Sequence, residues 1–389
     1  FPANRPYPAS GHCDMIDGSI LDCGLGLEPW IVAALWVWVF INRAFGRYLS
    51  GRQTWSQAIV VGRLAIGAVL SAPYMHDEAA AFRRVEAMLW GDAPICPHCG
   101  VVGKAYPLTG VRTKPSARNP EGKERFGLWK CRECRGPFTV RKGTIFEESH
   151  LPLHLWLQAI HLMVSSKKGI SSHQLHRVLG ITYKSAWFLT HRIRECMRDG
   201  ALAPFGSGGG TVEVDETFIG TKYKKSKTAR GHAHKNAMLT LVDRDTKQAK
   251  SIVVDDIKKD TLVPILRENI AKEAVIYTDE AKQYTRLSED FADHDFTTHS
   301  KGEYVKRKKP EVHTNTVEGF YSIFKRGMKG VYQHCGKQHL HRYAAEFDFR
   351  YNNRIANGVD DVERGEIALR SVIGKRLSYK SANKEVNVE

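Results

Sequence analysis

The stretch Thr211-Val212-Glu213-Val214-Asp215-Glu216-Thr217-Phe218 decides the fold of the larger part of this chain. Its alternation predicts a β-strand with Val212 and Val214 on one face and with Glu213 and Asp215 on the other. An acid in the middle of an otherwise buried strand is costly unless it has a partner or a function. We therefore expect a site to be built around this strand.

The segments that follow predict a mixed α/β domain. Strands are expected at Ala237–Val242, Ser251–Val254 and Val275–Thr278, and helices at Thr261–Lys272 and from Val312 onward. Three strands, a helix, a strand and a later helix is the order of an RNase H-like (integrase-type) fold. We assign residues 206–374 to this domain, and the glycine-rich run Gly206 to Gly210 is expected to be the linker that precedes it.

Two Cys-x-x-Cys pairs lie upstream and predict a zinc ribbon over residues 75–148. The pairs are Cys96 with Cys99 and Cys131 with Cys134, and a basic spacer of 31 residues separates them. Each pair presents two thiolates to one ion, so the four cysteines are expected to form a closed structural Zn²⁺ site. A helix before the first pair and a strand at Pro137–Phe146 complete the expected module.

Residues 149–205 predict helices in a helix-turn-helix order. A helix is expected to begin at Pro152, and Ser171-Ser172 is the expected cap of a second helix that ends at Leu179. Gly180 breaks that helix, and Thr182 caps a third helix that runs to about Met197. Such a pair of helices is typical of DNA-binding proteins.

The charge of the chain favours a polyanionic partner. The chain has 389 residues with 58 Lys and Arg against 42 Asp and Glu, a formal charge of +16, and a hydrophobic content of 42% that excludes wholesale disorder. Double-stranded DNA is the first candidate, although a soluble basic protein or a membrane-surface protein has the same balance. The side chains that we expect to contact DNA are Lys184, Arg192, Lys222, Lys224 and Lys225.

The two ends of the chain carry separate predictions. We interpret residues 1–74 as a non-native upstream segment, with Met75 as the natural start, and residues 375–389 as a polar tail. The apolar run Trp30 to Ile41 is too short to span a bilayer comfortably, which leaves a signal-peptide core or an interfacial segment as alternatives. Paired cysteines of the metal-binding kind favour a reducing compartment, so we expect a cytoplasmic protein, nucleoid-associated when bound to DNA, with no membrane partner.

Three carboxylates are candidates for a catalytic metal site. Asp215 lies on the first strand, Asp279 follows the apolar run Val275 to Tyr277, and Glu318 lies where the last helix begins. Converging acids can hold two Mg²⁺ or Mn²⁺ ions for phosphodiester chemistry. Taken singly, each could equally be a surface acid, a loop acid or a first-turn helix acid. Asp243 and the pair Asp255-Asp256 compete with them, and spacing alone does not choose.

Several motifs together resemble the zinc-ribbon DDE transposases of bacterial insertion sequences, the ISXO-type group. Besides the cysteine pairs, these motifs are Gly143-Thr144-Ile145-Phe146-Glu147, Val214-Asp215-Glu216-Thr217-Phe218-Ile219-Gly220, Tyr277-Thr278-Asp279, His313-Thr314-Asn315-Thr316-Val317-Glu318-Gly319-Phe320 and Phe324-Lys325-Arg326-Gly327. The resemblance runs from about His76 to Ile373 and leaves residues 1–74 without a counterpart.

The resemblance implies which side chains act. Asp215 and Asp279 would be the first two metal ligands, and the third would be either Asn315 or Glu318. We favour Glu318 for its charge, with Asn315 as a supporting contact one helical turn earlier. Lys325 is expected on the same helix face as Glu318, where it would contact a phosphate of the element end, or it is an ordinary solvated lysine.

The function implied by the resemblance is a transposase that binds the terminal inverted repeats of an insertion sequence. It would cleave and transfer DNA strands with two divalent ions, as a homodimer or a higher oligomer that joins element ends to target DNA. The alternatives are a catalytically silent zinc-ribbon and helix-turn-helix regulator, an RNase H-like nuclease that cuts without joining, and a membrane-associated basic protein.

Overall fold

The computed structural model describes residues 69–117, 119–198, 202–220 and 231–377. The predicted contacts Lys222, Lys224 and Lys225, the apolar run Trp30 to Ile41 and almost all of the predicted upstream segment and polar tail lie outside the described residues. Everything described belongs to one of the two units into which the chain divides, the unit that begins at Ala68.

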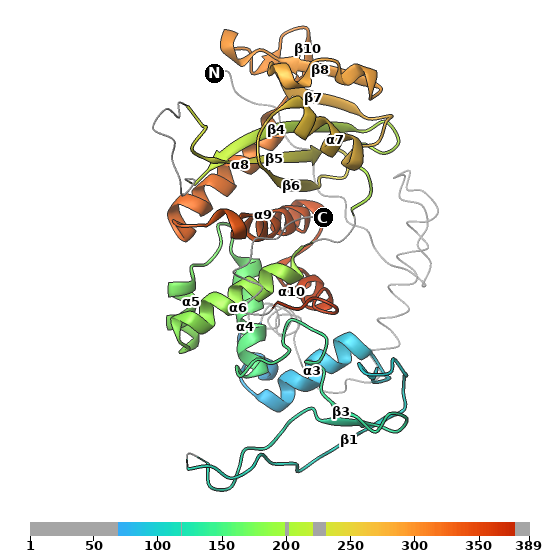
Figure 1. Cartoon of the computed structure of the whole chain (residues 1–389), viewed down its shortest axis with the longest axis vertical. Helices are drawn as coiled ribbons and strands as arrows, with labels where there is room; N and C mark the ends of the chain where they lie inside the picture. Colours follow the sequence, from blue (N-terminus) through green and yellow to red (C-terminus); the bar gives the residue numbers. More distant parts are fainter. Residues whose placement is uncertain (1–68, 118, 199–201, 221–230, 378–389) are drawn as a thin grey trace, which may run out of the picture. The chain divides into compact units, whose positions relative to one another are not determined.

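A mixed five-stranded sheet organises the second half of the described chain (Figure 1). Its order is β6-β5-β4-β7-β8, in which β4, β5 and β6 are antiparallel and β4, β7 and β8 are parallel. Its strands are β4 Thr211–Ile219, β5 Asn236–Asp243, β6 Ala249–Val254, β7 Val275–Asp279 and β8 Asp293–Thr297. A short ribbon of β9 Val305–Lys306 and β10 Lys309–His313 follows.

Helices cover both faces of this sheet, because side chains on both faces of β4 and β5 are buried. Val212 and Val214 join the core that includes α7 (Lys259–Asn269), as the strand alternation predicted. Met238 and Val242 join a second core with α8 (Asn315–Gly327) and α9 (Lys337–Asn352). A π-helical turn, η5 (Met328–Tyr332), connects α8 to α9. Glu213 and Asp215 therefore face α8, the side on which a site can form.

The first half of the described chain is helical around its own core. It contains α3 Glu78–Trp90, α4 Leu153–Ser165, α5 Ser172–Leu179 and α6 Tyr183–Cys196, and α10 Asp361–Arg370 joins them. The predicted caps are confirmed: the side chains of Ser171 and Thr182 accept backbone N–H groups at the starts of α5 and α6. Gly180 ends α5 in a left-handed conformation, with φ at 63°.

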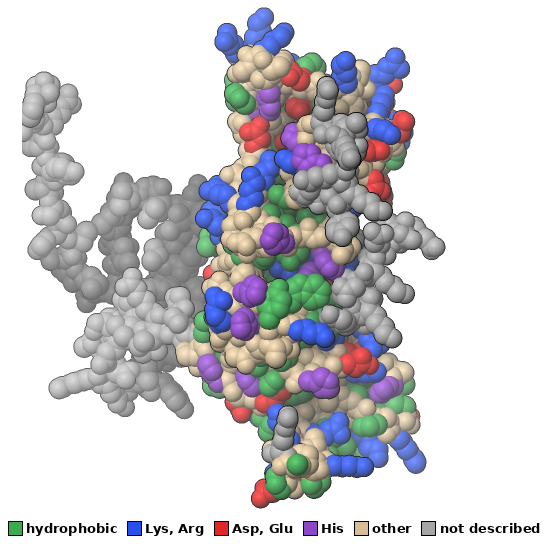
Figure 2. Space-filling model, turned by 60° about the vertical axis from the view of Figure 1, so that its left-hand side comes forward, with side chains coloured by type: hydrophobic (Ala, Val, Ile, Leu, Met, Phe, Trp, Pro, Cys, Tyr) green, Lys and Arg blue, Asp and Glu red, His purple; other side chains and the backbone are tan. Residues whose placement is uncertain are grey.

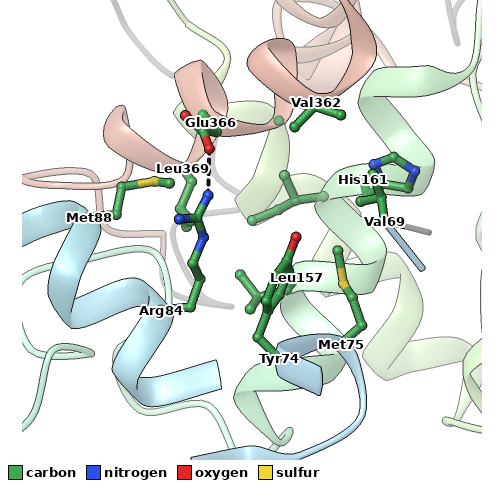
Figure 3. Close-up of a pocket in the computed structure, with 12 residues that line it drawn as sticks. Val69, Tyr74, Met75, Arg84, Met88, Leu157, His161, Val362, Glu366 and Leu369 are labelled. Carbon is green, nitrogen blue, oxygen red and sulfur yellow. Dashed lines mark hydrogen bonds and ion pairs between the residues drawn. The ribbon is translucent and has the colours of Figure 1, made fainter. Parts of the chain in front are cut away.

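The segment before α3 packs against this helical core. Met75 is buried, and Val69 and Tyr74 line a small cavity of about 50 Å³ with residues of α3, α4 and α10 (Figure 3). Arg84 of α3 donates to Glu366 of α10 beside it. The cavity is predominantly apolar and contains none of the predicted catalytic side chains, so we interpret it as a packing feature.

The cysteine module contains three short antiparallel strands, β1 Ala105–Pro107, β2 Trp129–Cys131 and β3 Pro137–Phe138. The predicted strand Pro137–Phe146 is wrong beyond Phe138. Turns follow there, because Thr144 accepts and donates local hydrogen bonds and the Glu147 carboxylate accepts the N–H of Gly143.

Two further expectations need correction. The last helix begins at Asn315 rather than Val312, since Lys309–His313 pairs as β10. The run Gly206 to Gly210 is a hydrogen-bonded turn rather than a free linker. Asp243 accepts the N–H of Gly206 at 2.8 Å, and Asp245 accepts the N–H of Thr211 at 2.9 Å, so this turn is fixed to the end of β5.

A buried ion pair joins the helical part to the sheet. Arg194 of α6 donates to Glu346 of α9 at 2.7 Å, and the two side chains are 1% and 0% exposed. Tyr332 and Arg350 also donate to Glu346. One carboxylate thus compensates two buried guanidinium groups, and α6 and α9 are held together by it.

We predict that Glu346→Gln destabilises the protein by about 3–5 kcal/mol, because it leaves two buried cations without a counter-charge. The free energy of unfolding is measured by urea titration of the full chain. The matched control is Glu121→Gln, since Glu121 is 89% exposed and is expected to change the result by less than about 0.5 kcal/mol. Equal midpoints for Glu346→Gln and the parent would contradict this role.

Candidate functional site

Asp215 and Asp279 lie side by side on the neighbouring strands β4 and β7, where β7 ends. Thr211 pairs with Val275 and Glu213 with Tyr277 in the parallel ladder of β4 and β7, and the same offset brings Asp215 level with Asp279. The backbone N–H of Ala281 donates to Asp279 at 3.0 Å, and that of Glu216 donates to Asp215 at 2.7 Å. The structure therefore brings together the first two carboxylates that the sequence singled out.

Glu318 approaches the same place from α8. Burial raises the pKa of Asp215 to about 8, with further increases from the charges of Glu216, Asp279 and Glu318. Four acids thus share one electrostatic environment. Within the described residues, no Lys or Arg side chain forms an ion pair with Asp215 or Asp279.

Such uncompensated carboxylates fit divalent cations, which take oxygen ligands and lower the cost of crowding acids. Among the described residues, only the four cysteines form a group of three or more potential ligands within 4.8 Å of one another, so the carboxylates are spread more widely than that.

Glu213, the other acid on this face, has a positional role that the sequence did not reveal. Its side chain is fully buried and accepts the backbone N–H groups of Thr316 and Val317 at 2.8 and 2.9 Å. Arg244 donates to it at 2.6 Å. The Glu213 carboxylate thus binds the N-terminal turn of α8, and it fixes the helix that carries Glu318 onto β4.

Three more side chains near the carboxylates were missed from the sequence. Tyr321 donates its hydroxyl to the backbone carbonyl of Asp215 at 2.6 Å, and Gln283 donates to Glu216 at 2.9 Å. The Nε2 atom of His299 lies 3.8 Å from Glu318. The spacing of Tyr321 and Glu318 along one helix face could have suggested the first contact, but nothing in the sequence pairs His299 with Glu318.

The two remaining predicted residues of α8, Lys325 and Asn315, lie in different surroundings. Lys325 is exposed, and its Nζ lies 5.5 Å from the centre of the Tyr321 ring, which places it on the Glu318 side of the helix. Asn315 lines a cavity with Gly319 and Ile323 instead. This position of Asn315 supports Glu318 rather than Asn315 as the third metal ligand.

The competing acids have structural partners. The Asp243 carboxylate accepts backbone N–H groups of Gly206, Asp245 and Thr246, which closes a turn. Asp256 accepts from Thr261 at the start of α7, and Asp255 pairs with Lys337. None of these three acids is among the charges that raise the pKa of Asp215.

Of the predicted DNA contacts, Lys184 is exposed near the start of α6, whereas Arg192 is not. Arg192 is 3% exposed, donates to the Glu147 carbonyl at 2.5 Å and lies over the rings of Trp156 and Phe188. Burial lowers its pKa to about 10. The prediction for Arg192 is wrong, because its guanidinium links α6 to the preceding loop and helix and cannot reach a phosphate.

The four predicted zinc ligands come together as expected. The Sγ atoms of Cys96 and Cys134 lie 3.7 Å apart, as do those of Cys99 and Cys131. Thiolates bound to zinc at about 2.3 Å in a tetrahedron lie about 3.8 Å apart, so this spacing fits one ion. Cys96 and Cys131 are buried against Trp90 and Trp129, which encloses one side of the cluster.

Two transposase family models match parts of this chain. Residues 208–352 match the ISXO2-like transposase domain, and residues 76–136 match the transposase zinc-ribbon domain. The chain belongs to this family of zinc-ribbon transposases. The resemblance stated from the sequence motifs is therefore confirmed.

Individual relatives are distant. An uncharacterized protein in the transposable element ISH50 of Halobacterium salinarum is 26% identical over 241 residues, which cover 58% of this chain and 78% of the relative. An uncharacterized transposase-like protein of Haemophilus influenzae is 26% identical over 103 residues, or 26% of this chain and 80% of the relative.

One solved structure that matches is a chain of the simian T-cell lymphotropic virus intasome in complex with PP2A regulatory subunit B56 gamma. It is 11% identical and has a TM-score of 0.24, with 46% of this transposase and 63% of that chain covered. This similarity is too low to support an argument. Separately, no helix in the described part of the transposase is long and apolar enough to cross a membrane.

We predict that the full chain binds about one zinc ion per molecule and that Cys131→Ser abolishes this binding, because a structural site needs all four thiolates. Metal content is measured by mass spectrometry after dialysis. Cys335→Ser is the control, since Cys335 lies outside the cluster. Retention of zinc by Cys131→Ser would show that the cluster is not the binding site.

We also predict that the Asp215 carboxyl makes stability fall as pH rises. A raised pKa means that the folded chain holds this proton more tightly than the unfolded chain does. The free energy of unfolding therefore decreases from about pH 4 to about pH 8 as the proton is lost. Without added Mg²⁺, Asp215→Asn should resist urea better than the parent at pH 8.5, and this advantage should shrink near pH 5.

The control for the pH effect is Asp255→Asn, whose side chain is 84% exposed and whose difference from the parent should not vary in this way. Mg²⁺ should stabilise the parent at pH 8.5 more than it stabilises Asp215→Asn. An advantage of Asp215→Asn that is the same at both pH values would contradict the proton assignment.

Proposed function

We propose that this transposase acts by DDE-type chemistry, cleaving DNA at the ends of an insertion sequence and transferring the freed strands to target DNA. The observation that carries the proposal is the convergence of Asp215, Asp279 and Glu318 from β4, β7 and α8 without a cationic partner for either aspartate among the described residues. Hydrolysis and transesterification of phosphodiesters both need this concentration of oxygen ligands.

The sheet order supports an RNase H-like fold for this domain. Three antiparallel strands are followed by two parallel ones, and α8 packs against the central strands with its N-terminus beside the carboxylates. We assign residues 206–374 to this domain, 149–205 to a helix-turn-helix region and 75–148 to the zinc ribbon. The last two pack closely with α9 and α10, so the three parts act as neighbours rather than as separate modules.

The chain's own groups have separate roles in the reaction. When bound, two Mg²⁺ or Mn²⁺ ions would activate the attacking water or 3′-hydroxyl and stabilise the leaving oxygen. Asp215 and Asp279 would hold these ions, with Glu318 as the third ligand. Glu213 and Tyr321 position α8 and β4 against each other. Lys325, about two helical turns beyond Glu318, would contact a phosphate next to the carboxylates.

The α5 and α6 pair supports a helix-turn-helix that binds the terminal inverted repeats. The helices are joined by a tight turn at Gly180, and Lys184 is exposed at the start of α6. Figure 2 shows Lys, Arg and His side chains gathered in the middle of one face of the described residues, with few acids among them. The basic spacer of the ribbon would add contacts to the DNA backbone.

Joining two element ends to one target requires that they be held at the same time, so we propose a homodimer or a higher oligomer. The protein would work in the cytoplasm on nucleoid DNA. A silent DNA-binding regulator and a nuclease that cuts without joining are the two alternative functions, and one assay separates all three.

We predict that the full chain joins a labelled oligonucleotide with the element end to supercoiled plasmid in Mg²⁺ or Mn²⁺, and that Asp279→Asn reduces joining on the order of a hundredfold or more. Loss of a metal ligand removes several kcal/mol of transition-state stabilisation, and each 1.4 kcal/mol is about tenfold. Glu318→Gln should behave alike, whereas Asn315→Ala should keep most of the cleavage activity. Joined product is measured on denaturing gels.

Asp255→Asn is the control, because this exposed acid pairs with Lys337 away from the carboxylates. Binding of the element end without nicking or joining would favour the regulator, and nicking without joining would favour the nuclease. Loss of activity in Asn315→Ala with retention in Glu318→Gln would reverse the assignment of the third ligand.

A further inference from the structure

Two cavities lie beside α8. One has a volume of about 760 Å³ and is lined by α8 together with the ends of α4 and α9 and the start of α10. The other has about 290 Å³ and is lined by the turn after β5 and by His313. Both are lined by Thr316, Tyr351 and Arg354, so they adjoin one another, and we refer to them together as the groove.

The helix period separates the groove from the side of α8 that carries Glu318. Asn315, Gly319 and Ile323 recur at intervals of four and line the groove. Glu318 and Lys325 lie about 60° and about 80° around the helix axis from Asn315, on the side where Tyr321 reaches the backbone of Asp215. The groove and the carboxylates thus lie on neighbouring sides of one helix.

The lining of the groove is largely apolar and includes several cations. Lys167, Lys247 and Arg354 line it, and none of them has a carboxylate within 4 Å among the described residues. Arg350 also lines it, but its charge is already compensated by Glu346. Two acids, Asp243 and Asp361, line it too. The groove thus offers the positive charges of Lys167, Lys247 and Arg354.

Aromatic rings form the second part of the lining. The guanidinium carbon of Arg354 lies 3.6 Å from the centre of the Tyr351 ring, which indicates stacking. The Tyr351 ring meets Phe320 edge-on, with centres 5.4 Å apart and an interplanar angle of 84°. Arg354 and Tyr351 thus form a stacked pair that carries a positive charge.

We infer that this groove binds a single strand of DNA. Unpaired cations that follow a strand's phosphates, together with a flat aromatic or guanidinium surface for its bases, characterise single-strand binding sites. A cavity of about 760 Å³ can hold unstacked bases of a single strand. In a duplex, the bases are stacked within the double helix and do not reach such a surface. The inference rests on the proposed function, because it assumes that DNA is cut at the carboxylates.

The position of the groove suggests which strand it holds. A strand that separates from the duplex at the carboxylates needs to pass only around α8 to reach Arg354 and Tyr351. Holding it there would keep it away from the reacting phosphate and would fix the duplex end in place. We therefore assign the groove to a strand released next to the cleavage site.

The test measures binding of a labelled oligothymidylate of about 15 nucleotides by fluorescence anisotropy. It uses the full chain with Asp279→Asn to prevent cutting. Combining Lys247→Ala with Arg354→Ala should weaken single-strand binding about tenfold or more and reduce its salt dependence. Binding of the duplex element end should change less than about twofold. Lys258→Ala combined with Lys272→Ala is the charge-matched control, since both lysines are exposed and they lie just before and just after α7.

Tyr351 supplies a second pair of variants. Tyr351→Phe should keep single-strand binding because stacking needs the ring and not the hydroxyl, whereas Tyr351→Leu should weaken it. Photo-crosslinking of an oligonucleotide with 5-iodouracil should label residues of the groove, with Tyr351 among them. Unchanged single-strand binding in the Lys247 and Arg354 variant, or crosslinks only outside the groove, would overturn the inference.

Different results would contradict the proposed function and the groove assignment. If the parent binds the duplex element end but the groove variants bind single strands as well as it does, only the groove assignment fails. If the parent binds neither duplex nor single strand, the proposed function fails with it. Chemical crosslinking that places a second copy of the chain in the groove would also overturn the single-strand assignment.

Discussion

The contact between Glu213 and the first turn of α8 is the constraint on which the site depends. A carboxylate with no exposed surface accepts two backbone N–H groups and the Thr316 hydroxyl of α8, and it is paired with Arg244. A helix N-terminus carries partial positive charge and unsatisfied donors, so a buried acid satisfies both. Since Glu213 is two residues from Asp215 on the same strand face, the strand that carries Asp215 also positions the helix that carries Glu318.

A second buried acid, Glu346, has a similar role between α6 and α9. Glu346 receives Arg194 from α6 as well as Arg350 and Tyr332, and Arg194 also lies 4.0 Å from the centre of the Tyr343 ring. Because these charges are removed from water, the pair tolerates little displacement. A shift of α6 on binding DNA would therefore be transmitted to α9, which packs in the same core as α8.

The sequence predicted those features that depend on local pattern. The alternation from Val212 to Asp215 correctly predicted which side chains share a face of β4. The capping residues Ser171 and Thr182 correctly predicted where α5 and α6 begin. The cysteine spacing predicted a cluster that the structure closes. These features are set by neighbours within a few residues, or by a ligand geometry that repeats in many proteins.

The sequence did not predict features that depend on contacts between segments far apart in the chain. Arg192 looked like a DNA contact, but the Glu147 loop and Trp156 bury it from the other side. Glu213 looked equivalent to Asp215, because nothing local shows that α8, about a hundred residues later, supplies its hydrogen bonds. The glycine run looked like a linker because the acids that fix it, Asp243 and Asp245, lie at the far end of the β4 and β5 hairpin.

These constraints together make α8 the element on which the chemistry of the chain is organised. Its N-terminus is fixed by Glu213, one side carries Glu318 toward Asp215, and a neighbouring side lines the groove that contains Arg354 and Tyr351. A helix fixed at its end and packed on β4 and β5 has little freedom to rotate, since Val317, Tyr321 and Phe324 are all buried in one core. Neither side of α8 can therefore move without the other, so a strand seated in the groove would hold the helix that presents Glu318 in place. In this arrangement the binding of a released strand and the geometry of the carboxylates are mechanically linked through a single helix.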